Sequence, residues 1–180
     1  MKLEKASKEA IKYACLKFHY AKSIPVNTFR YSVFNDKNEW CGVILFGTGA
    51  NRHLATQFGY SQGQVIELVR VALNGKQDNV SKPLSVALKL IKKDCPLVKK
   101  IISYADKDQG HKGTIYKATN WKVEYVTKGE RYFIVKGKKT HPRSIYGKCK
   151  QSLEDIRKYL DKDATEYWTT GKILYSFTIK

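Results

Sequence analysis

The order of its apolar runs limits this chain to an architecture that mixes helices and strands. From residue 28 onward, β-rich runs and amphipathic segments follow one another in the order β-β-β-α-β-α-β-β. The first hairpin joins residues 28–34 and 40–46 through the turn Asn35–Asn38, and the third strand is 65–73. Helices alternate with strands only in the second half, which favours a mixed α/β (α+β) fold with a central mixed β-sheet flanked by helices.

The remaining segments complete one domain. Residues 122–126 and 131–135 are expected to pair as a second hairpin, and Ser81 is a candidate cap of the central helix. We expect a main domain over residues 1–150, with residues 151–180 as a helix and strand extension of the same domain. The predicted helices are 4–18, the segment from Ser81 to Cys95–Pro96, 114–119 and 152–160, and the other predicted strands are 100–104 and 173–179.

Positive charge dominates the composition. Lys and Arg total 34 against 16 Asp and Glu, a net charge of +18. This balance favours a polyanionic partner such as DNA, RNA or an anionic membrane, with a solvated basic surface as the alternative. The sequence contains no run of about 18 consecutive apolar residues, so no membrane-spanning helix is expected. The N-terminal segment lacks the apolar core of a signal peptide, and the four cysteines form no C-x-x-C pair, so free thiols in the cytoplasm are expected.

Two charged residues interrupt the aliphatic strand at 65–73. Glu67 and Arg70 are three residues apart, and the two-residue period of a strand puts them on opposite faces. A charge in such a strand needs a partner or a ligand. The guanidinium fork of Arg70 suits a phosphate or a carboxylate, and a structural salt bridge is the alternative.

The segment 104–121, YADKDQGHKGTIYKATNW, is the main candidate for an active site. Asp106 ends a buried strand, where open α/β sheets often hold active sites, and it could act as a general base or a metal ligand. Two glycines bracket His111 before the helix that carries Tyr116, so backbone amides can approach a ligand. The alternatives are that Asp106 caps a turn or the next helix and that Tyr116 packs against the sheet.

Two further groups are candidates for ligand contacts. His19, at the end of the first helix, could gather with His111 and a carboxylate such as Asp106 around a metal ion, which sequence spacing leaves open. The stretch 128–150 interleaves basic and aromatic side chains; charges attract phosphates and aromatics stack on bases, with a basic surface hairpin as the alternative. The candidate DNA contacts in it are Lys136, Lys138, Lys139 and Arg143.

The segment 104–121 closely resembles the signature of the phage Mom DNA-modification proteins, in which Y/F-A-D precedes G-H-x-G-T-I-Y-x-A-T-N-W. Shorter pieces resemble other Mom motifs in the same order, and the resemblance covers about residues 15–147. These pieces are KFHYAKSIP, CGVILFGTGAN, VIELVRVALN and HPRSIY.

This resemblance implies a GNAT-like (acetyltransferase-type) fold over residues 1–150 and a DNA-modifying enzyme. The family converts adenine in DNA to a methylcarbamoyl derivative on its exocyclic amine, which protects phage DNA from host restriction. Carried over by position, Asp106, Tyr116 and Arg70 belong to the catalytic centre, and His19 with Asp106 holds iron. The partner is then double-stranded DNA in the cytoplasm of the bacterial host, with no membrane involved and with a homodimer as one open arrangement.

The resemblance also implies a donor of the transferred group, acetyl-CoA or another compound. Acetyltransferases hold the CoA pyrophosphate with an R/Q-x-x-G-x-G/A loop, whereas the corresponding region here, NGKQDNVSKP, has only Gly75. The candidate anion ligands are therefore Arg70 and the helix-start amides near Ser81 and Ser85. The source of the transferred group stays open. The competing functions are a GNAT-type N-acetyltransferase acting on a small-molecule or protein amine and a non-enzymatic DNA-binding phage protein.

Overall fold

The computed structural model describes residues 1–49 and 53–179, which form two compact units. The first unit comprises Met1–Ala105, Gly113–Tyr125 and Leu174–Lys180, and the second comprises Asp106–Lys112 and Val126–Ile173. Each unit has its own sheet and its own buried apolar cluster. The assignment of residues 151–180 to an extension of one domain stays a prediction.

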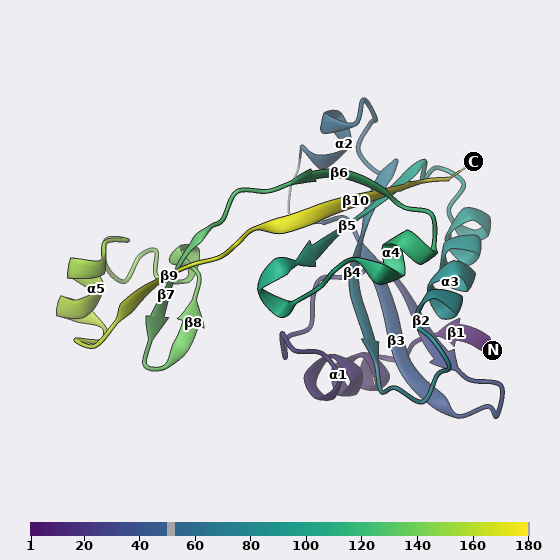
Figure 1. The fold of residues 1–180 in the computed structure, drawn as a ribbon, viewed down its shortest axis with the longest axis horizontal. Helices are drawn as coiled ribbons and strands as arrows, with labels where there is room; N and C mark the ends of the chain where they lie inside the picture. The colour runs from purple at the N-terminus through teal and green to yellow at the C-terminus, as the bar shows by residue number, and fades with distance from the viewer. Residues whose placement is uncertain (50–52, 180) are drawn as a thin grey trace. The chain divides into compact units, whose positions relative to one another are not determined.

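The first unit is built on a seven-stranded mixed sheet, as the sequence predicts (Figure 1). Its first four strands are antiparallel to one another, and the fourth pairs with the fifth in parallel. The backbone N–H of Ile179 donates to the carbonyl of Lys99 (2.9 Å) and that of Lys107 donates to the carbonyl of Gly171 (3.4 Å), so the last strand of the chain runs antiparallel to the fifth. In spatial order the strands are β1 (Lys2–Lys5), β2 (Phe29–Phe34), β3 (Trp40–Gly47), β4 (Val65–Leu73), β5 (Lys100–Asp106), β10 (Lys172–Thr178) and β6 (Lys122–Val126).

Two helices cover one face of this sheet. Helix α1 (Lys8–Lys17) begins after Ser7, whose hydroxyl accepts the N–H of Ala10 at 3.1 Å. It packs its buried residues against β3 and β4, and the short helix α2 (Leu54–Gln57) packs near β5 and β10 on the same face. The sequence pattern extended the first helix back to residue 4, but residues 2–5 instead form β1 on the edge of the sheet.

The opposite face carries α3 (Ser81–Asp94) and α4 (Thr114–Ala118). Tyr31 of β2 lies opposite Ile44 of β3. Val43 and Leu45, the neighbours of Ile44, face α1, so Ile44 and Tyr31 both point to the other face of the sheet. The hydroxyl of Tyr31 lies 3.4 Å from Oδ2 of Asp94 at the end of α3. Consequently the two helix pairs enclose the sheet from both sides.

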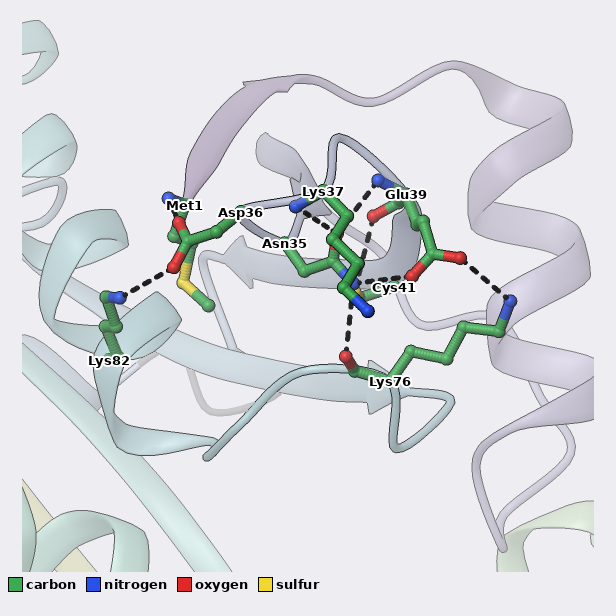
Figure 2. A network of polar contacts seen from close by, with 8 residues as sticks. All are labelled: Met1, Asn35, Asp36, Lys37, Glu39, Cys41, Lys76 and Lys82. Atoms are coloured by element: carbon green, nitrogen blue, oxygen red, sulfur yellow. Dashed lines mark hydrogen bonds and ion pairs between the residues drawn. The ribbon is translucent and has the colours of Figure 1, made fainter.

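A polar network fixes the turn between β2 and β3 to the segment that leads into α3 (Figure 2). Oδ1 of Asn35 accepts the N–H groups of Lys37 and Glu39 at 3.0 and 2.9 Å, and its Nδ2 donates to the carbonyl of Lys76 at 3.2 Å. Asp36 accepts from the amino group of Met1 and from Nζ of Lys82. The network therefore ties together three stretches that are far apart in the sequence.

The second unit contains a three-stranded antiparallel sheet in the order β8-β7-β9 and one α-helix. The prediction that residues 122–126 pair with residues 131–135 is wrong, because β6 lies beside β10 in the large sheet. Lys136 and Gly137 both have positive φ (50° and 71°), which makes a tight turn and gives β7 its nearest partner in β8. The elements are β7 (Arg131–Val135), β8 (Lys138–Thr140), α5 (Leu153–Tyr159) and β9 (Thr165–Trp168), with short 3-10 turns η1 (Lys107–Gln109) and η2 (Pro142–Ser144).

The core of the second unit is small and continuous. Phe133, Ile145, Ile156 and Ala164 come from β7, the segment after η2, α5 and the segment before β9, and each is almost fully buried. Over the whole described part of the chain, no helix is both long enough and apolar enough to cross a membrane.

Candidate active site

A β-bulge in β4 brings two charged side chains to one face of the large sheet. Arg70 lies opposite Leu45 of β3 and Glu67 lies opposite Gly47, while the ladder shifts by one residue between these two pairs. Leu45 and Gly47 are two residues apart on β3 and share a face, so Glu67 and Arg70 share that face as well. The expectation that simple alternation places them on opposite faces is therefore wrong.

Arg70 contacts the chain that leaves α1. Its Nη1 lies 2.8 Å from Nδ1 of His19, and its Nη2 lies 3.5 Å from Oγ of Ser23. Arginine only donates hydrogen bonds, and Nδ1 also accepts the N–H of Ala21 at 3.1 Å. Nδ1 of His19 thus faces two donors, while Nε2 lies 3.3 Å from the same Nη1. The Nε of Arg70 is buried and has no hydrogen-bond partner among the described residues.

The predicted iron site finds no support in this geometry. Nδ1 of His19 is occupied by Arg70, and a guanidinium beside a ligand nitrogen disfavours a metal cation there. Oδ1 of Asp106, the second expected ligand, accepts the N–H of Asp108 at 3.0 Å. Within residues 1–49 and 53–179, no three His, Cys, Asp or Glu residues gather in a group that could hold a metal ion.

The hydrogen-bonded ladder between β4 and β5 ends at Glu67. Backbone pairing joins Val65–Glu67 to Lys100–Ile102. Just past that point, the hydroxyl of Ser103 donates to the carbonyl oxygen of Leu68 at 2.9 Å. The Ser103 side chain thus takes the place of the next backbone hydrogen bond between β4 and β5. Beyond Leu68, β4 pairs with β3 alone.

Tyr116 of α4 reaches the same point from the other face of the sheet. Its hydroxyl lies 2.9 Å from Oγ of Ser103, and its ring stacks on Tyr175 with centroids 4.4 Å apart. Burial raises the pKa of Tyr116 to about 12, and its neighbours Tyr20, Tyr175 and Glu67 add to this rise. Burial likewise raises the pKa of Tyr104 on β5 to about 12. Tyr116 therefore packs against the sheet, which is the alternative role considered for it from the sequence.

Gly113 allows α4 to begin against Tyr175. Its φ is 70°, in the left-handed region, and a Cβ placed on it would lie 1.9 Å from the hydroxyl oxygen of Tyr175. The second glycine of the segment GHKG is thus required by close packing as well as by backbone conformation. Gly110 has a similar φ of 68° but faces open space.

In the second unit, Asp106 acts as a cap. Its Oδ1 accepts the N–H of Asp108 at 3.0 Å at the start of η1, which is the capping role weighed as the alternative. His111 is exposed in the same segment of this unit. The role of Asp106 as a general base stays a prediction.

Asp108 is a residue whose importance the sequence did not signal. Its carboxylate accepts the N–H and the hydroxyl of Thr170 at 2.9 and 2.7 Å and the hydroxyl of Tyr167 at 2.9 Å. Nζ of Lys139 lies 3.6 Å away. These hydrogen bonds from Thr170, with smaller effects of Tyr167 and Lys139, lower the pKa of Asp108 to about 2. Asp108 thus anchors the segment 106–112 to the end of β9.

The four candidate DNA contacts all lie in the second unit. Lys139 is partly used within the unit, because it pairs with Asp108 and lies over the rings of Tyr132 and Tyr167 at 4.8 and 4.2 Å. Lys136 lies in the turn between β7 and β8, Lys138 begins β8, and Arg143 lies in η2. Their contacts with DNA stay predictions.

Comparison with known proteins places the chain in a family. The model of the Mom protein family matches residues 1–177. The chain belongs to the Mom protein family. No curated protein sequence matches it. The family assignment confirms the resemblance drawn from segment 104–121.

Solved structures show the fold of this Mom family member. A Bacillus subtilis acetyltransferase in complex with CoA has a TM-score of 0.54 and 10% identity, covering 99% of this chain and 97% of the other. An aminoglycoside N-acetyltransferase has a TM-score of 0.56 and 9% identity, covering 98% and 95%. A GNAT family acetyltransferase from Bacillus anthracis has a TM-score of 0.52 and 14% identity, covering 98% and 93%. The predicted GNAT-like fold is confirmed.

The start of α3 in this Mom chain offers few backbone amides for an anion. Ser81 is the first helical residue, and the cap is made by Oδ1 of Asn79, which accepts the N–H of Lys82 at 2.8 Å. Pro83 has no N–H. Ser85 lies one turn further on and lines a pocket between α3 and β6. Ser81 is thus not the cap that the sequence suggested, and the roles of Ser81 and Ser85 in binding a donor stay predictions.

Proposed function

We propose that this chain is a transferase that modifies the exocyclic amine of adenine in double-stranded DNA. The product is the methylcarbamoyl-type adenine that the family resemblance implies, and it protects phage DNA from host restriction. The observation that carries the proposal is the position of Glu67, Arg70 and Tyr116 around the point where the β4–β5 ladder ends, in a member of the Mom family.

The chemistry requires a proton acceptor and a group that stabilises negative charge. The lone pair of the exocyclic amine is delocalised into the ring, so attack is helped by a base that removes an N–H proton. Glu67 is a carboxylate on the same face as Arg70, and Asp106 is the carboxylate that the resemblance assigns. Arg70, whose Nε has no partner among the described residues, suits an anionic group or a developing oxyanion.

Tyr116 acts in this proposal by holding the site in place. Because its pKa is about 12, its hydroxyl stays protonated at neutral pH. The single proton of Ser103 goes to Leu68, so Tyr116 donates to Ser103 and fixes the position of β5 beside β4. This makes Tyr116 a positioning residue of the catalytic centre.

An acyl-CoA is the donor that fits the fold best. When bound, a thioester would supply an activated acyl group, and attack of the adenine amine on it would release the thiol and give an N-acyl adenine. The additional nitrogen of a methylcarbamoyl group would have to come from a second, nitrogen-containing donor. The end of the β4–β5 ladder leaves backbone groups beyond Leu68 unpaired with β5, which suits an extended ligand arm. The amide of Lys82 is already used by Asn79, so Arg70 takes a larger part in binding the anionic end.

The charge of the chain favours DNA as the substrate. The net charge is +18, and the second unit alone contains fourteen Lys and Arg against eight Asp and Glu. A target base inside a duplex must be flipped out of the stack, and contacts to the phosphate backbone on either side stabilise that state.

Mass spectrometry of nucleosides tests the proposal. Plasmid DNA from cells that express the chain should contain a new adenine derivative, and unmodified nucleosides would overturn the proposed function. Glu67→Gln and Asp106→Asn separate the two candidate bases, because each keeps the shape of the side chain and the carboxamide oxygen of Asp106→Asn can still cap η1. The base is the residue whose amide variant loses the product, whereas retained product in Asp106→Asn removes that carboxylate from the mechanism.

An ordinary N-acetyltransferase is the second candidate function, favoured by the GNAT fold. One structural neighbour is an aminoglycoside acetyltransferase in complex with coenzyme A and kanamycin. Acetylation of a small-molecule amine by the purified chain, together with unchanged nucleosides, would support this alternative.

A further inference from the structure

A pocket of about 760 Å³ lies in the first unit away from the candidate active site. It is lined by one side of α3, the end of α4, the start of β5 and β6, and the end of β10. Glu67, Arg70 and Tyr116 do not line it. It lies at the end of the sheet where β5 and β6 begin. The loop between β5 and α4 leaves the sheet at the opposite end. This volume suits a small organic ligand.

Four lysines and one carboxylate line the pocket. Lys100 is largely buried, with Nζ 3.4 Å from both Oγ of Ser176 and Oγ1 of Thr178 and 3.9 Å from Oε1 of Glu124. Glu124 is also paired with Lys122 at 3.0 Å. The hydrogen bond from Ser176, aided by Lys122 and Lys100, lowers the pKa of Glu124, so it is ionised at neutral pH. One negative charge therefore faces two lysines on this wall.

The opposite wall adds positive charge without compensation. Lys89 and Lys92 of α3 are exposed at the pocket and make no hydrogen bond or ion pair with the described residues. They are three residues apart, so both side chains lie on one side of the helix. The pocket thus has a net charge of about +3 from its lining side chains, which favours a ligand with several negative charges.

The rest of the lining suits a flat, polar ring. Phe177 is half-buried beside Trp121, with ring centroids 5.7 Å apart, and offers an aromatic surface. Asn120 is exposed in a left-handed turn (φ 60°) at the end of α4 and provides a carboxamide. A carboxamide donates and accepts hydrogen bonds, as the edge of a nucleobase does.

We propose that this pocket binds a nucleotide carrying a diphosphate or triphosphate. The phosphates lie between Lys89, Lys92 and Lys100, and the base lies toward Phe177 and Asn120. Lysine binds phosphate as a point charge, and no glycine-rich loop is needed. The inference is independent of the proposed function, because it concerns other residues and binding alone.

Adjacent lysines of α3 provide a matched test. Lys92 lines the pocket and Lys93 does not, although both are exposed in the last turn of the helix. Lys92→Glu and Lys93→Glu change the net charge and the helix terminus equally. Isothermal titration calorimetry of the full chain with ADP should show about tenfold weaker binding in Lys92→Glu, the size expected for one charged hydrogen bond. Lys93→Glu should bind ADP as the unmodified chain does.

Further probes identify the ligand chemistry. Adenosine, which lacks phosphates, should bind much more weakly than ADP. Absence of ADP binding, or equal loss in Lys92→Glu and Lys93→Glu, would overturn the proposal. A selective loss in Lys92→Glu of binding to a short DNA duplex, with ADP binding unaffected, would also overturn it and would make the pocket a contact for the DNA backbone. Thermal melting of both variants checks that each is folded.

Discussion

The hydroxyl of Tyr116 donates a hydrogen bond to Oγ of Ser103, which lies 2.9 Å away. The direction follows from the second bond of Ser103, whose only proton goes to the carbonyl of Leu68. This relay links α4 to both β4 and β5 where their ladder ends. It accounts for the burial of two polar groups in the interior of the first unit.

The relay predicts unequal effects of its two deletions on stability. Tyr116→Phe removes one donor and leaves the bond from Ser103 to Leu68 intact, which should cost about 1 kcal/mol. Ser103→Ala leaves both the Tyr116 hydroxyl and the Leu68 carbonyl unpaired and should cost about 1–3 kcal/mol. Urea denaturation measures both. Adding Tyr116→Phe to Ser103→Ala should recover part of the loss, and strictly additive effects would rule out the relay.

The ionisation of Tyr116 should destabilise the chain at high pH. Its pKa is about 12 in the folded chain against 10.0 for an ordinary tyrosine, because burial disfavours the phenolate. In the unfolded chain the proton leaves first, so the free energy of unfolding falls as pH rises from about 10 through about 12. Ultraviolet absorbance of tyrosinate as a function of pH measures the ionisation that causes this loss of stability. Tyr116→Phe should lose part of the late-titrating absorbance, and an unchanged titration would contradict the burial.

Replacing Gly113 and Gly110 by alanine compares the loss of stability caused by a side chain at a crowded and at an open position. Both have φ near 70°, so alanine at either position should cost about 1 kcal/mol through the backbone. Only at Gly113 does a Cβ meet the hydroxyl of Tyr175, which should add about 1–3 kcal/mol. Thermal unfolding of Gly113→Ala and Gly110→Ala tests the difference, and equal costs would show that Tyr175 moves away freely.

Asp108 should make the stability of the second unit sensitive to acid. Its pKa is lowered from 3.8 to about 2, chiefly by the hydroxyl and amide of Thr170. The carboxylate therefore contributes stability above about pH 4, and this contribution is lost as pH falls through about 2. Asp108→Asn should be less stable than the unmodified chain near neutral pH and lose this difference at about pH 2. Circular dichroism during thermal unfolding provides the measurement, and a difference that persists in acid would contradict this account.

Local sequence patterns were enough to place most elements and to identify the family. The strand 65–73 and the start of the helix at Ser81 agree with the structure, because hydrophobic periodicity and turn residues act over a few neighbours. The motif at 104–121 led to the Mom family, whose model matches residues 1–177. The order of the strand and helix segments predicted the mixed sheet flanked by helices that the structure confirms.

Contacts between distant segments decided the rest. Glu67 and Arg70 share a face only because β3 and β4 pair with a bulge, and that register depends on two strands at once. The partner of residues 131–135 depended on the turn at Lys136–Gly137 and on the core of the second unit. Asp108 acquired its partners from residues about 60 positions away. The sequence alone determined most of the segments that become strands and helices and the family to which the chain belongs, whereas β1, β8, β9 and α2 were not predicted. The tertiary structure decided which side chains meet, because side-chain orientation and pairing depend on contacts that no local pattern contains.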